Sequence, residues 1–326
     1  MKIGIVGYGN VGKGVEQAIS LNPDAELFAI YTRRDPAEIT PATKGVQVLP
    51  MSALNTRAGG PDVLILCGGS AKDLPEMTPA LAAKYSVVDS FDTHAKVAEH
   101  FTKVQKATEK NKTVAIICSG WDPGLFSIAR TYMLAAIPAG KAYTFWGTGV
   151  SQGHSDAVRR IEGVADARQY TIPIKEAVDS VRRGEFPELT TRQKHKRDCY
   201  VVLKEGADAE RVKNEIITMP NYFDEYDTTV TFITQEEMDK NHCEMPHGGS
   251  VIRSGLANEK GDHKSVMEFS LKLDSNPEFT GGVLLACARA AYKMKARGCT
   301  GAYTMLDIAP ADLLPLTKEE IINSLV

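Results

Sequence analysis

A glycine-rich turn directly after a short apolar stretch is the feature that most constrains the fold. Residues 3–6 carry the β-branched side chains of Ile3, Ile5 and Val6, and the sequence Gly7-Tyr8-Gly9-Asn10-Val11-Gly12 follows, before a helical pattern with apolar positions at 15, 18 and 19. In such a strand-turn-helix unit the first glycine permits a tight turn, the second lets a pyrophosphate approach the backbone, and the third lets the helix pack on the strand. The helix N-terminus then faces the phosphates. The motif therefore predicts a dinucleotide-binding site at residues 7–12.

The next apolar stretch, residues 26–31, ends in Thr32-Arg33-Arg34. At this point, about 20 residues after the glycines, a site for NAD usually has an acidic residue that binds the ribose 2′-hydroxyl. A carboxylate would repel a 2′-phosphate, whereas two guanidinium groups and a hydroxyl can bind it through charge-assisted hydrogen bonds. The sequence favours NADP(H) over NAD(H). The alternative is that the two arginines are ordinary solvated residues of a loop.

Further apolar stretches alternate with helical patterns over the first 120 residues. Counting the first two, five strands are expected, the later ones at 62–67, 86–92 and 113–118. This alternation predicts a Rossmann-type, doubly wound parallel sheet, an α/β fold. The third strand leads into Cys67-Gly68-Gly69-Ser70-Ala71, whose small side chains would let the cofactor come close, unless the segment is simply a glycine turn.

Two carboxylates follow the ends of later strands. Asp92 lies just beyond the fourth strand, and Asp122 lies beyond the fifth, next to Trp121 in a turn rich in Gly and Pro. The carboxyl ends of parallel strands face the ligand crevice, so these two side chains could converge there. Each one taken alone could equally be a helix N-cap or a turn residue. A Trp in such a turn favours a site, because the ring needs something to pack on.

The pattern changes after residue 120. Apolar alternation predicts strands near 167–174, 197–204, 228–234, 250–256 and 265–273, with helices near 124–137, 174–184 and 207–218. This pattern indicates a mixed, largely antiparallel sheet with helices, an α+β domain. Open sheets of this kind commonly serve as dimer interfaces, and this domain is expected to bind the substrate and to form the dimer. Residues 184–197 are expected to be a long connection. A strong helix at 279–297 and a terminal helix at 317–326 are expected to return to the first domain. The expected division is therefore 1–120 plus 277–326 for the NADP-binding domain and 121–276 for the second domain.

Composition excludes several classes of protein. A net charge of −3 and a pI of about 6.2 give no electrostatic reason to expect nucleic acid or an anionic membrane as a partner. No apolar run reaches the length of a membrane span, and no signal-peptide pattern is present at the start, so the protein is expected in the cytoplasm. The six cysteines are scattered without metal-binding spacing, and they are expected to be reduced thiols, with no metal site.

Once these motifs are laid out, the chain resembles the meso-diaminopimelate D-dehydrogenases, in their longer-chain subgroup. The resemblance runs over nearly the whole chain, and the WDPG, SQGHSDA and MPHGG runs are far more specific than the glycine motif. The matching segments are GYGNVG (7–12), TRR (32–34), CGGSA (67–71), VDSFDTH (88–94), SGWDPGLFSI (119–128), TFWGTGVSQGHSDAVRRI (144–161), QYTIP (169–173), HKRDCYVV (195–202), MPHGG (245–249) and LKLDSNPEFT (271–280).

The resemblance implies NADP-linked, reversible oxidative deamination at the D-centre of meso-2,6-diaminopimelate, a step of lysine biosynthesis that releases ammonia, and it implies a homodimer. It also implies roles for particular residues. Around the D-amino centre it places Asp92, Asp122 and Trp121, with Gln152 and Gly153 in contact with the substrate and Asp156 nearby. As the clamp on the distal L-amino acid end it implies Thr171, Arg197, His247 and Asn276.

Residue chemistry agrees with this assignment. Arg197 offers a two-pronged fork for a carboxylate, which hydroxyl, amide and imidazole groups can complete. Taken alone, Arg197 would be a surface cation and His247 a core or turn histidine. Two other functions remain open from the sequence: a dehydrogenase for a different amino or hydroxy acid, and a catalytically silent NADPH-binding regulator.

Overall fold

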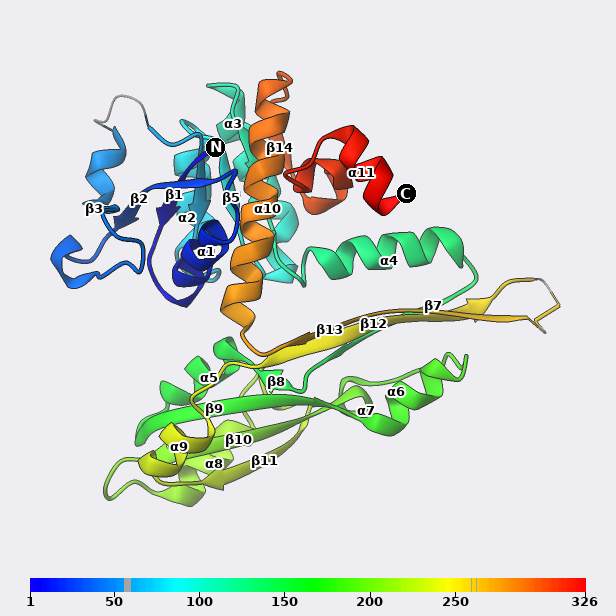
Figure 1. Ribbon diagram of the computed structural model, residues 1–326. Helices are drawn as coiled ribbons and strands as arrows, with labels where there is room; N and C mark the ends of the chain where they lie inside the picture. Colours follow the sequence, from blue (N-terminus) through cyan, green and yellow to red (C-terminus); the bar gives the residue numbers. More distant parts are fainter. Residues whose placement is uncertain (56–59, 259, 262) are drawn as a thin grey trace. The chain divides into compact units, whose positions relative to one another are not determined.

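The structure is a computed structural model that describes residues 1–55, 60–258, 260–261 and 263–326. The chain divides into two compact units (Figure 1). The first contains Met1–Ile128 and Pro277–Val326, and the second contains Ala129–Asn276. Within the described residues, no helix is both long enough and apolar enough to cross a membrane.

A seven-stranded sheet forms the centre of the first unit, in the order β14-β6-β5-β4-β1-β2-β3. All of its paired strands run parallel. The glycine turn at residues 7–12 follows β1, at the carboxyl end of a central strand, where ligands of such sheets bind. The strands are β1 (Lys2–Val6), β2 (Glu26–Thr32), β3 (Gln47–Pro50), β4 (Val63–Leu66), β5 (Val87–Asp89), β6 (Val114–Ile116) and β14 (Gly301–Tyr303).

Both faces of this sheet are buried, which is why its strands are almost continuously apolar. One core contains Ile3, Ile5 and Ile65 together with Val15 of α1 (Asn10–Ser20) and Leu284 of α10 (Asn276–Ala296). The other core contains the opposite sides of the same strands, packed against α2 (Leu74–Ala82) and α3 (Val97–Glu109). The sheet is therefore the middle of three layers.

The C-terminal segment completes the first unit. α10 approaches α1 so closely that a Cβ on Gly14 would overlap the carbonyl oxygen of Pro277. Arg289 of α10 is largely buried and forms an ion pair with Asp24, with Nε 2.6 Å from Oδ2. β14 then pairs with β6, and α11 (Lys318–Leu325) ends the chain.

The second unit contains two sheets. A four-stranded sheet has the order β11-β10-β9-β8, and a three-stranded antiparallel sheet has the order β13-β12-β7. The strands are β7 (Gly140–Trp146), β8 (Gly149–Val150), β9 (Val164–Pro173), β10 (His195–Leu203), β11 (Asp227–Phe232), β12 (His247–Leu256) and β13 (Lys264–Leu273). The helices are α4 (Leu125–Ala136), which begins in the first unit, α5 (Gln152–Arg159), α6 (Lys175–Arg182), α7 (Thr191–Lys194), α8 (Ala209–Ile217) and α9 (Gln235–Asn241).

The predicted fold class is confirmed: a doubly wound parallel sheet accompanies a second α+β unit. Three details of the prediction are wrong. The sheet has two further strands, β3 and β14, which are too short to give an apolar pattern. The second unit has two sheets instead of one, although its one parallel pair among the described strands, β10–β11, agrees with the predicted mixed and largely antiparallel pairing. The expected long connection at 184–197 contains α7, whose capping box begins at Thr190, and the start of β10.

Candidate functional site

The glycine turn, the end of β2 and the loop after β4 surround one cavity in the first unit. Its volume is about 260 Å³. Gly7 has a φ of 91°, a value that glycine adopts without strain, so the chain can turn back toward β2. The cavity is lined by Val6, Gly7, Tyr8, Gly9, Tyr31, Thr32, Arg33, Arg34, Met51, Cys67, Gly68, Gly69, Asp73 and Met77. Asn10, Val11 and Gly12 start α1 instead, and Ser70 and Ala71 continue the loop after β4.

Both arginines at the end of β2 already have partners in this cavity. Arg34 donates from Nη2 to the carbonyl oxygen of Tyr8, at 2.5 Å, and its backbone N–H donates to Thr32 Oγ1. Arg33 pairs with Asp73, with 2.8 Å between Nη2 and Oδ1, although its side chain is 65% exposed. The hydrogen bond from the Gly69 N–H, followed by the pair with Arg33, lowers the pKa of Asp73, so this carboxylate is charged at neutral pH. Asp73 thus holds Arg33, which the sequence assigns to the 2′-phosphate, beside the cavity.

Two glycines of the turn at residues 7–12, Gly9 and Gly12, allow a test of the predicted pyrophosphate site. We expect Gly9→Ala to fold normally, because no described atom lies within 4 Å of the position that its Cβ would take. The added methyl would nevertheless occupy the space that a pyrophosphate needs beside the backbone, so NADPH affinity should fall at least about tenfold. Gly12→Ala should instead lower Tm, since its Cβ would overlap the carbonyl oxygen of Gly7. Thermal unfolding and NADPH titration of both variants check this; a Gly9→Ala protein with normal NADPH affinity would contradict it.

The loops after the adjacent strands β5 and β6 carry Asp92, Trp121 and Asp122. The backbone N–H of Asp92 donates to Ser70 Oγ, at 2.9 Å, which joins this loop to the one after β4. The Trp121 ring meets Phe126 edge-on, with 5.2 Å between ring centres. The turn closes at Gly124, with a φ of 133°, where any Cβ would overlap the carbonyl oxygen of Gly120. Both carboxylates therefore follow strand ends on the same edge of the sheet, as the sequence predicts.

Arg197 is a buried cation in the second unit. It lies on β10 opposite Thr171 of β9, and its Nη1 donates to Thr171 Oγ1. Its guanidinium carbon lies 3.9 Å from the ring centre of Tyr226, a cation–π contact. Only 5% of Arg197 is exposed, its Nε has no hydrogen-bond partner, and the described groups that act on its charge are Tyr226 and Cys199, with no carboxylate among them. A buried charge without a counter-ion is unfavourable, so the site is suited to an anionic ligand.

Three histidines near this guanidinium are held neutral. Burial, and then the charge of Arg197, lowers the pKa of both His154 and His195 to about 3. The same two causes lower the pKa of His247. The backbone contacts agree with neutral rings: Trp146 N–H donates to Nε2 of His195, and Gly248 N–H donates to Nδ1 of His247. Nδ1 of His247 also lies 3.1 Å from the carbonyl oxygen of Gly248, so the backbone of Gly248 holds this ring through Nδ1.

These histidines predict a loss of stability at acidic pH. In the unfolded chain a histidine titrates near 6.5, whereas folded His154 and His195 titrate near 3. The unfolded state therefore binds more protons as the pH falls below about 6.5, and each histidine removes about 1.4 kcal/mol of stability per pH unit until the folded pKa is reached. We expect urea unfolding at pH 5 to give a lower free energy than at pH 7, with both imidazoles still neutral by NMR. Imidazole signals that titrate near 6.5 would contradict this.

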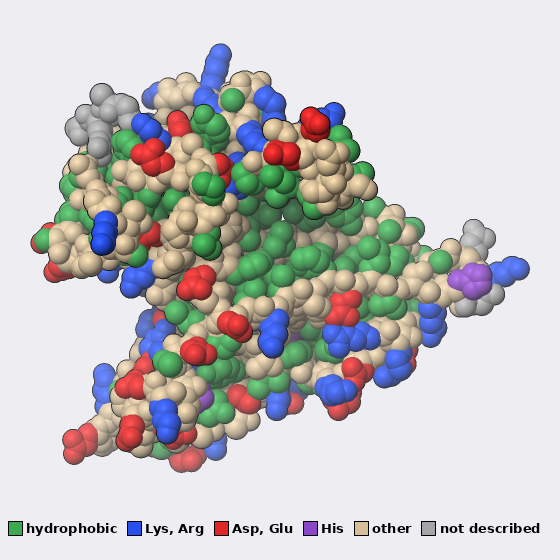
Figure 2. Space-filling view, in the orientation of Figure 1, with side chains coloured by type: hydrophobic (Ala, Val, Ile, Leu, Met, Phe, Trp, Pro, Cys, Tyr) green, Lys and Arg blue, Asp and Glu red, His purple; other side chains and the backbone are tan. Residues whose placement is uncertain are grey.

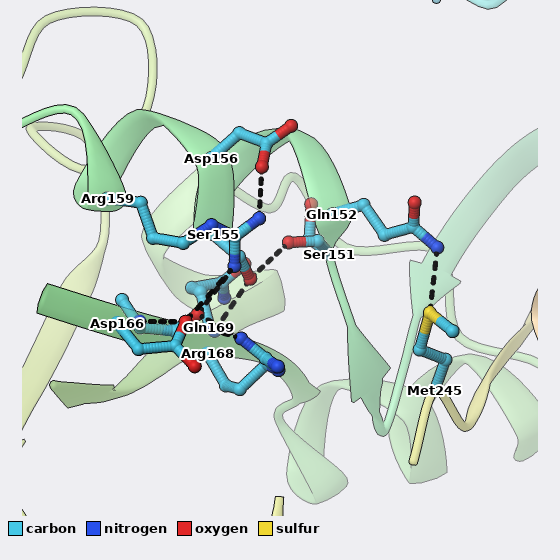
Figure 3. A network of polar contacts seen from close by, with 10 residues as sticks. Ser151, Gln152, Ser155, Asp156, Arg159, Asp166, Arg168, Gln169 and Met245 are labelled. Atoms are coloured by element: carbon cyan, nitrogen blue, oxygen red, sulfur yellow. Dashed lines mark hydrogen bonds and ion pairs between the residues drawn. The ribbon is translucent and has the colours of Figure 1, made fainter. Parts of the chain in front are cut away.

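The remaining predicted substrate residues of the second unit lie around Met245. Gln152, the first residue of α5, donates from Nε2 to Met245 Sδ at 3.2 Å (Figure 3). The Asn276 N–H donates to the carbonyl oxygen of Met245. His247 follows two residues later and packs directly against Gly149, which is paired with Thr171. The contacts thus bring Thr171, Arg197 and His247 together, and they join Gln152 and Asn276 through one methionine.

Asp156, unlike the other predicted substrate residues of the second unit, has its side chain paired with a neighbour on its own helix. Its carboxylate forms an ion pair with Arg159, three residues further along α5, and Figure 3 shows it turned toward that arginine. Gly153 lies on the exposed side of the same helix, with no described atom within 4 Å of a would-be Cβ. The N-terminus of α5 is fixed to β9, because Ser151 N–H donates to the carbonyl oxygen of Gln169 and Gln169 N–H donates to Ser155 Oγ. Gln152 is therefore held on a rigid support.

Sequence reasoning missed Tyr226, His154 and His195. His154 and His195 lie within the SQGHSDA and HKRDCYVV runs, so their position was visible but their neutral state depends on burial. Tyr226 belongs to no motif and precedes a short strand, and nothing in the sequence pairs it with Arg197. Within the described residues no group of three or more His, Cys, Asp or Glu could hold a metal ion.

A parallel sheet with a glycine-lined cavity at its carboxyl edge, joined in one chain to a unit with a buried anion site, defines a dinucleotide-dependent oxidoreductase. Comparison with known proteins agrees. The family model described as the diaminopimelic acid dehydrogenase C-terminal domain matches residues 120–275. The meso-diaminopimelate D-dehydrogenase of Ureibacillus thermosphaericus is 55% identical over 326 residues, covering 100% of this chain and 99% of that protein.

Two solved structures are also similar over the whole chain. The diaminopimelate dehydrogenase of Corynebacterium glutamicum in complex with diaminopimelate superposes with a TM-score of 0.93 at 43% identity, covering 100% of this chain and 99% of that one. An engineered D-amino acid dehydrogenase bound to NADP+ gives a TM-score of 0.88 at 41% identity, with the same coverage. The chain belongs to the meso-diaminopimelate D-dehydrogenase family, a group of amino acid dehydrogenases.

Proposed function

We propose that the protein catalyses the reversible, NADP-dependent oxidative deamination of meso-2,6-diaminopimelate at its D-centre, in lysine biosynthesis. The products are L-2-amino-6-oxopimelate, which cyclises to tetrahydrodipicolinate, and ammonia. The single observation that carries the proposal is the buried, carboxylate-free guanidinium of Arg197 in a chain of this family. The carboxylate at the L-centre of the substrate would supply the negative charge that the guanidinium of Arg197 lacks in the protein.

NADP(H) is the cofactor that the first unit fits best. The backbone at Gly9 is open to a pyrophosphate, and the N-terminus of α1 begins next to it. Thr32, Arg33 and Arg34 line the same cavity and supply the donors that a 2′-phosphate needs. When bound, the nicotinamide accepts the hydride from the D-centre. The relative crystallised with NADP+ supports this choice.

The clamp for the L-centre is formed by Thr171, Arg197, His247 and Asn276. Arg197 can bind a carboxylate with two parallel hydrogen bonds, and its direction is fixed by Thr171 on one side and the Tyr226 ring on the other. The neutral ring of His247 keeps one N–H, which can complete the hydrogen bonds to the carboxylate. Because neutral imidazoles carry no charge, the guanidinium is the one permanent cation among these groups, and it matches the single charge of a carboxylate.

At the D-centre we assign the amino group to Asp92 and Asp122, with Trp121 directly before Asp122 in the chain. Two carboxylates can anchor an ammonium group and accept the proton that leaves when the amine is oxidised. Gln152 and Gly153 would contact the substrate at this end. Asp156 has a smaller role, because its carboxylate is engaged by Arg159. In this assignment the first unit supplies the cofactor site and the D-centre carboxylates, and the second unit supplies the clamp.

We also propose a homodimer that works in the cytoplasm. Large apolar side chains are exposed in the second unit on β13, at Val266, Met267 and Phe269, and on α4, at Tyr132 and Leu134. Hydrophobic side chains gather visibly over these elements in Figure 2, and exposed apolar patches of this kind are typical of interfaces. All six cysteines are free, which suits a reducing compartment.

Product analysis tests the reaction. We expect incubation with meso-diaminopimelate and NADP+ to yield ammonia and NADPH in a one-to-one ratio. Chiral chromatography should find only the L configuration at the remaining amino centre. Ammonia without NADPH, or a remaining D-centre, would contradict the proposal. Without added cofactor, neither product should form.

A further inference from the structure

One fully buried carboxylate in the first unit has no part in the proposed chemistry. Asp89, the last residue of β5, has 0% exposure, and it lies three residues before Asp92. Four donors converge on it, two on each oxygen. Burying a carboxyl group costs free energy unless hydrogen bonds compensate for the lost water. An apolar side chain would fill the same space without this cost, so the hydrogen bonds of Asp89 indicate a role beyond packing.

The two oxygens of Asp89 bind different parts of the molecule. Oδ2 accepts from Thr78 Oγ1 of α2, at 2.7 Å, and from His100 Nε2 of α3, at 2.8 Å. Both donors belong to helices that cover one face of the sheet (Figure 1). His100 is itself fixed, because its ring stacks on Phe91 with 4.1 Å between ring centres. Oδ2 is therefore anchored to the scaffold.

Oδ1 holds the two loops that carry the proposed D-centre residues. It accepts the N–H of Phe91, at 3.1 Å, directly before Asp92. It also accepts the N–H of Cys118, at 2.9 Å, three residues before Trp121. The Asp89 carbonyl oxygen takes the next N–H of the same turn, from Ser119, at 2.8 Å.

The second loop needs such a restraint. Cys118 has a φ of 57°, the left-handed region that a residue with a Cβ seldom adopts without support. It opens the turn that leads through Gly120 to Trp121 and Asp122. A displacement of about 1 Å at reacting groups can cost about 100-fold in rate. A rigid link between the two loops would therefore matter for turnover more than for cofactor binding.

We propose that Asp89 is a positioning residue of the D-centre: its Oδ2 is fixed by Thr78 and His100, and its Oδ1 sets the loops of Asp92 and of Trp121–Asp122 relative to each other. This inference rests on the proposed function. It adds to that function a residue that touches neither substrate nor cofactor. It also predicts different effects for the two oxygens. Loss of the hydrogen bonds to Oδ1 should lower kcat, whereas loss of a hydrogen bond to Oδ2 should lower the stability of the fold.

Three variants test this division. Asp89→Ala removes both loop bonds, and we expect kcat with meso-diaminopimelate to fall about 100-fold while the Kd for NADPH stays within threefold of wild type. Asp89→Asn retains an oxygen that can accept from both loop N–H groups, so kcat should stay within about fivefold. Thr78→Val is the matched control, because it removes one donor from Oδ2 only. Its Tm should fall, and its kcat should stay within about twofold.

Should Asp89→Ala fail to fold, Asp89→Glu takes its place, since it keeps the carboxyl group but displaces both oxygens, and its kcat should fall at least thirtyfold with NADPH binding retained. A folded Asp89→Ala or Asp89→Glu protein with kcat within fivefold of wild type would overturn the inference. So would losses of kcat that merely follow Tm across all variants, Thr78→Val included. Failure of the wild-type protein to oxidise meso-diaminopimelate would instead overturn the proposed function.

Discussion

Replacing Arg197 by leucine should lower kcat/KM for meso-diaminopimelate by about three orders of magnitude and leave the affinity for NADPH unchanged. Each charge-assisted hydrogen bond contributes about 1.5–3 kcal/mol, so a two-pronged contact with a carboxylate is worth about 3–6 kcal/mol, or roughly two to four decades. The loss should appear in KM as well as in kcat, because the clamp also binds the ground state. Steady-state kinetics with NADP+ measures both.

The same substitution should not destabilise the folded protein. Arg197 is buried without an ion-pair partner among the described residues, so the fold loses an uncompensated charge when leucine replaces it. We expect an equal or higher Tm. The matched control is Arg253→Leu, a second buried arginine of the same unit whose guanidinium donates to the carbonyl oxygens of Ile137, Pro138 and Gly140. That variant should lose stability and keep its KM. An Arg197→Leu enzyme with the wild-type KM for meso-diaminopimelate would show that the clamp is assigned wrongly.

The second large effect concerns the choice of cofactor. Arg33→Ala combined with Arg34→Ala should weaken NADPH binding by about 100-fold or more and change NADH binding by less than about tenfold. Each guanidinium bond to the 2′-phosphate contributes about 1.5 kcal/mol at this exposed position, at the lower end of the range for charged groups. Fluorescence titration with both cofactors measures the two affinities.

The single substitutions separate two contributions. Arg34 also holds the carbonyl oxygen of Tyr8, so Arg34→Ala should weaken both cofactors somewhat by loosening the glycine turn. Arg33 contacts Asp73 rather than the turn, so Arg33→Ala should affect NADPH alone. Arg33→Lys keeps the positive charge but loses the two-pronged hydrogen bonding of the guanidinium, so its NADPH affinity should lie between those of wild type and Arg33→Ala. Equal losses for NADPH and NADH in the double variant would refute the assignment of the 2′-phosphate to these arginines.

The architecture of the first unit could be predicted because its signals are local. A β-branched run, three glycines and a helical repeat specify β1, the turn and α1 within twenty residues. β3 and β14 could not be found, since four and three residues give no periodicity and their place in the sheet is fixed by long-range pairing. The parallel pairing of β10 with β11 is likewise a property of the packed unit.

Contacts between distant segments could not be predicted in the candidate site either. Sequence motifs name Arg33, Arg197 and Asp92, because these stand in recognisable runs of residues. They do not reveal the partner of each: Asp73 beside Arg33 and Tyr226 beside Arg197 come from segments 40 and 29 residues away. Asp89 lies inside a recognised run, VDSFDTH, yet two of its four hydrogen bonds come from helices α2 and α3 and a third comes from Cys118, in the loop after β6. Charge state and position are decided by burial, which the sequence alone does not give.

The most direct measurement of the central claim is the absorbance at 340 nm during incubation of the purified protein with NADP+ and, separately, the meso, LL and DD isomers of diaminopimelate. Oxidation at a D-centre with an L-centre held by the Arg197 clamp predicts rapid reduction with the meso isomer and little with the LL isomer. The DD isomer should react poorly, because it has a D-centre but presents the wrong configuration to the clamp. No reduction with any isomer, from a protein that binds NADPH tightly, would contradict the account.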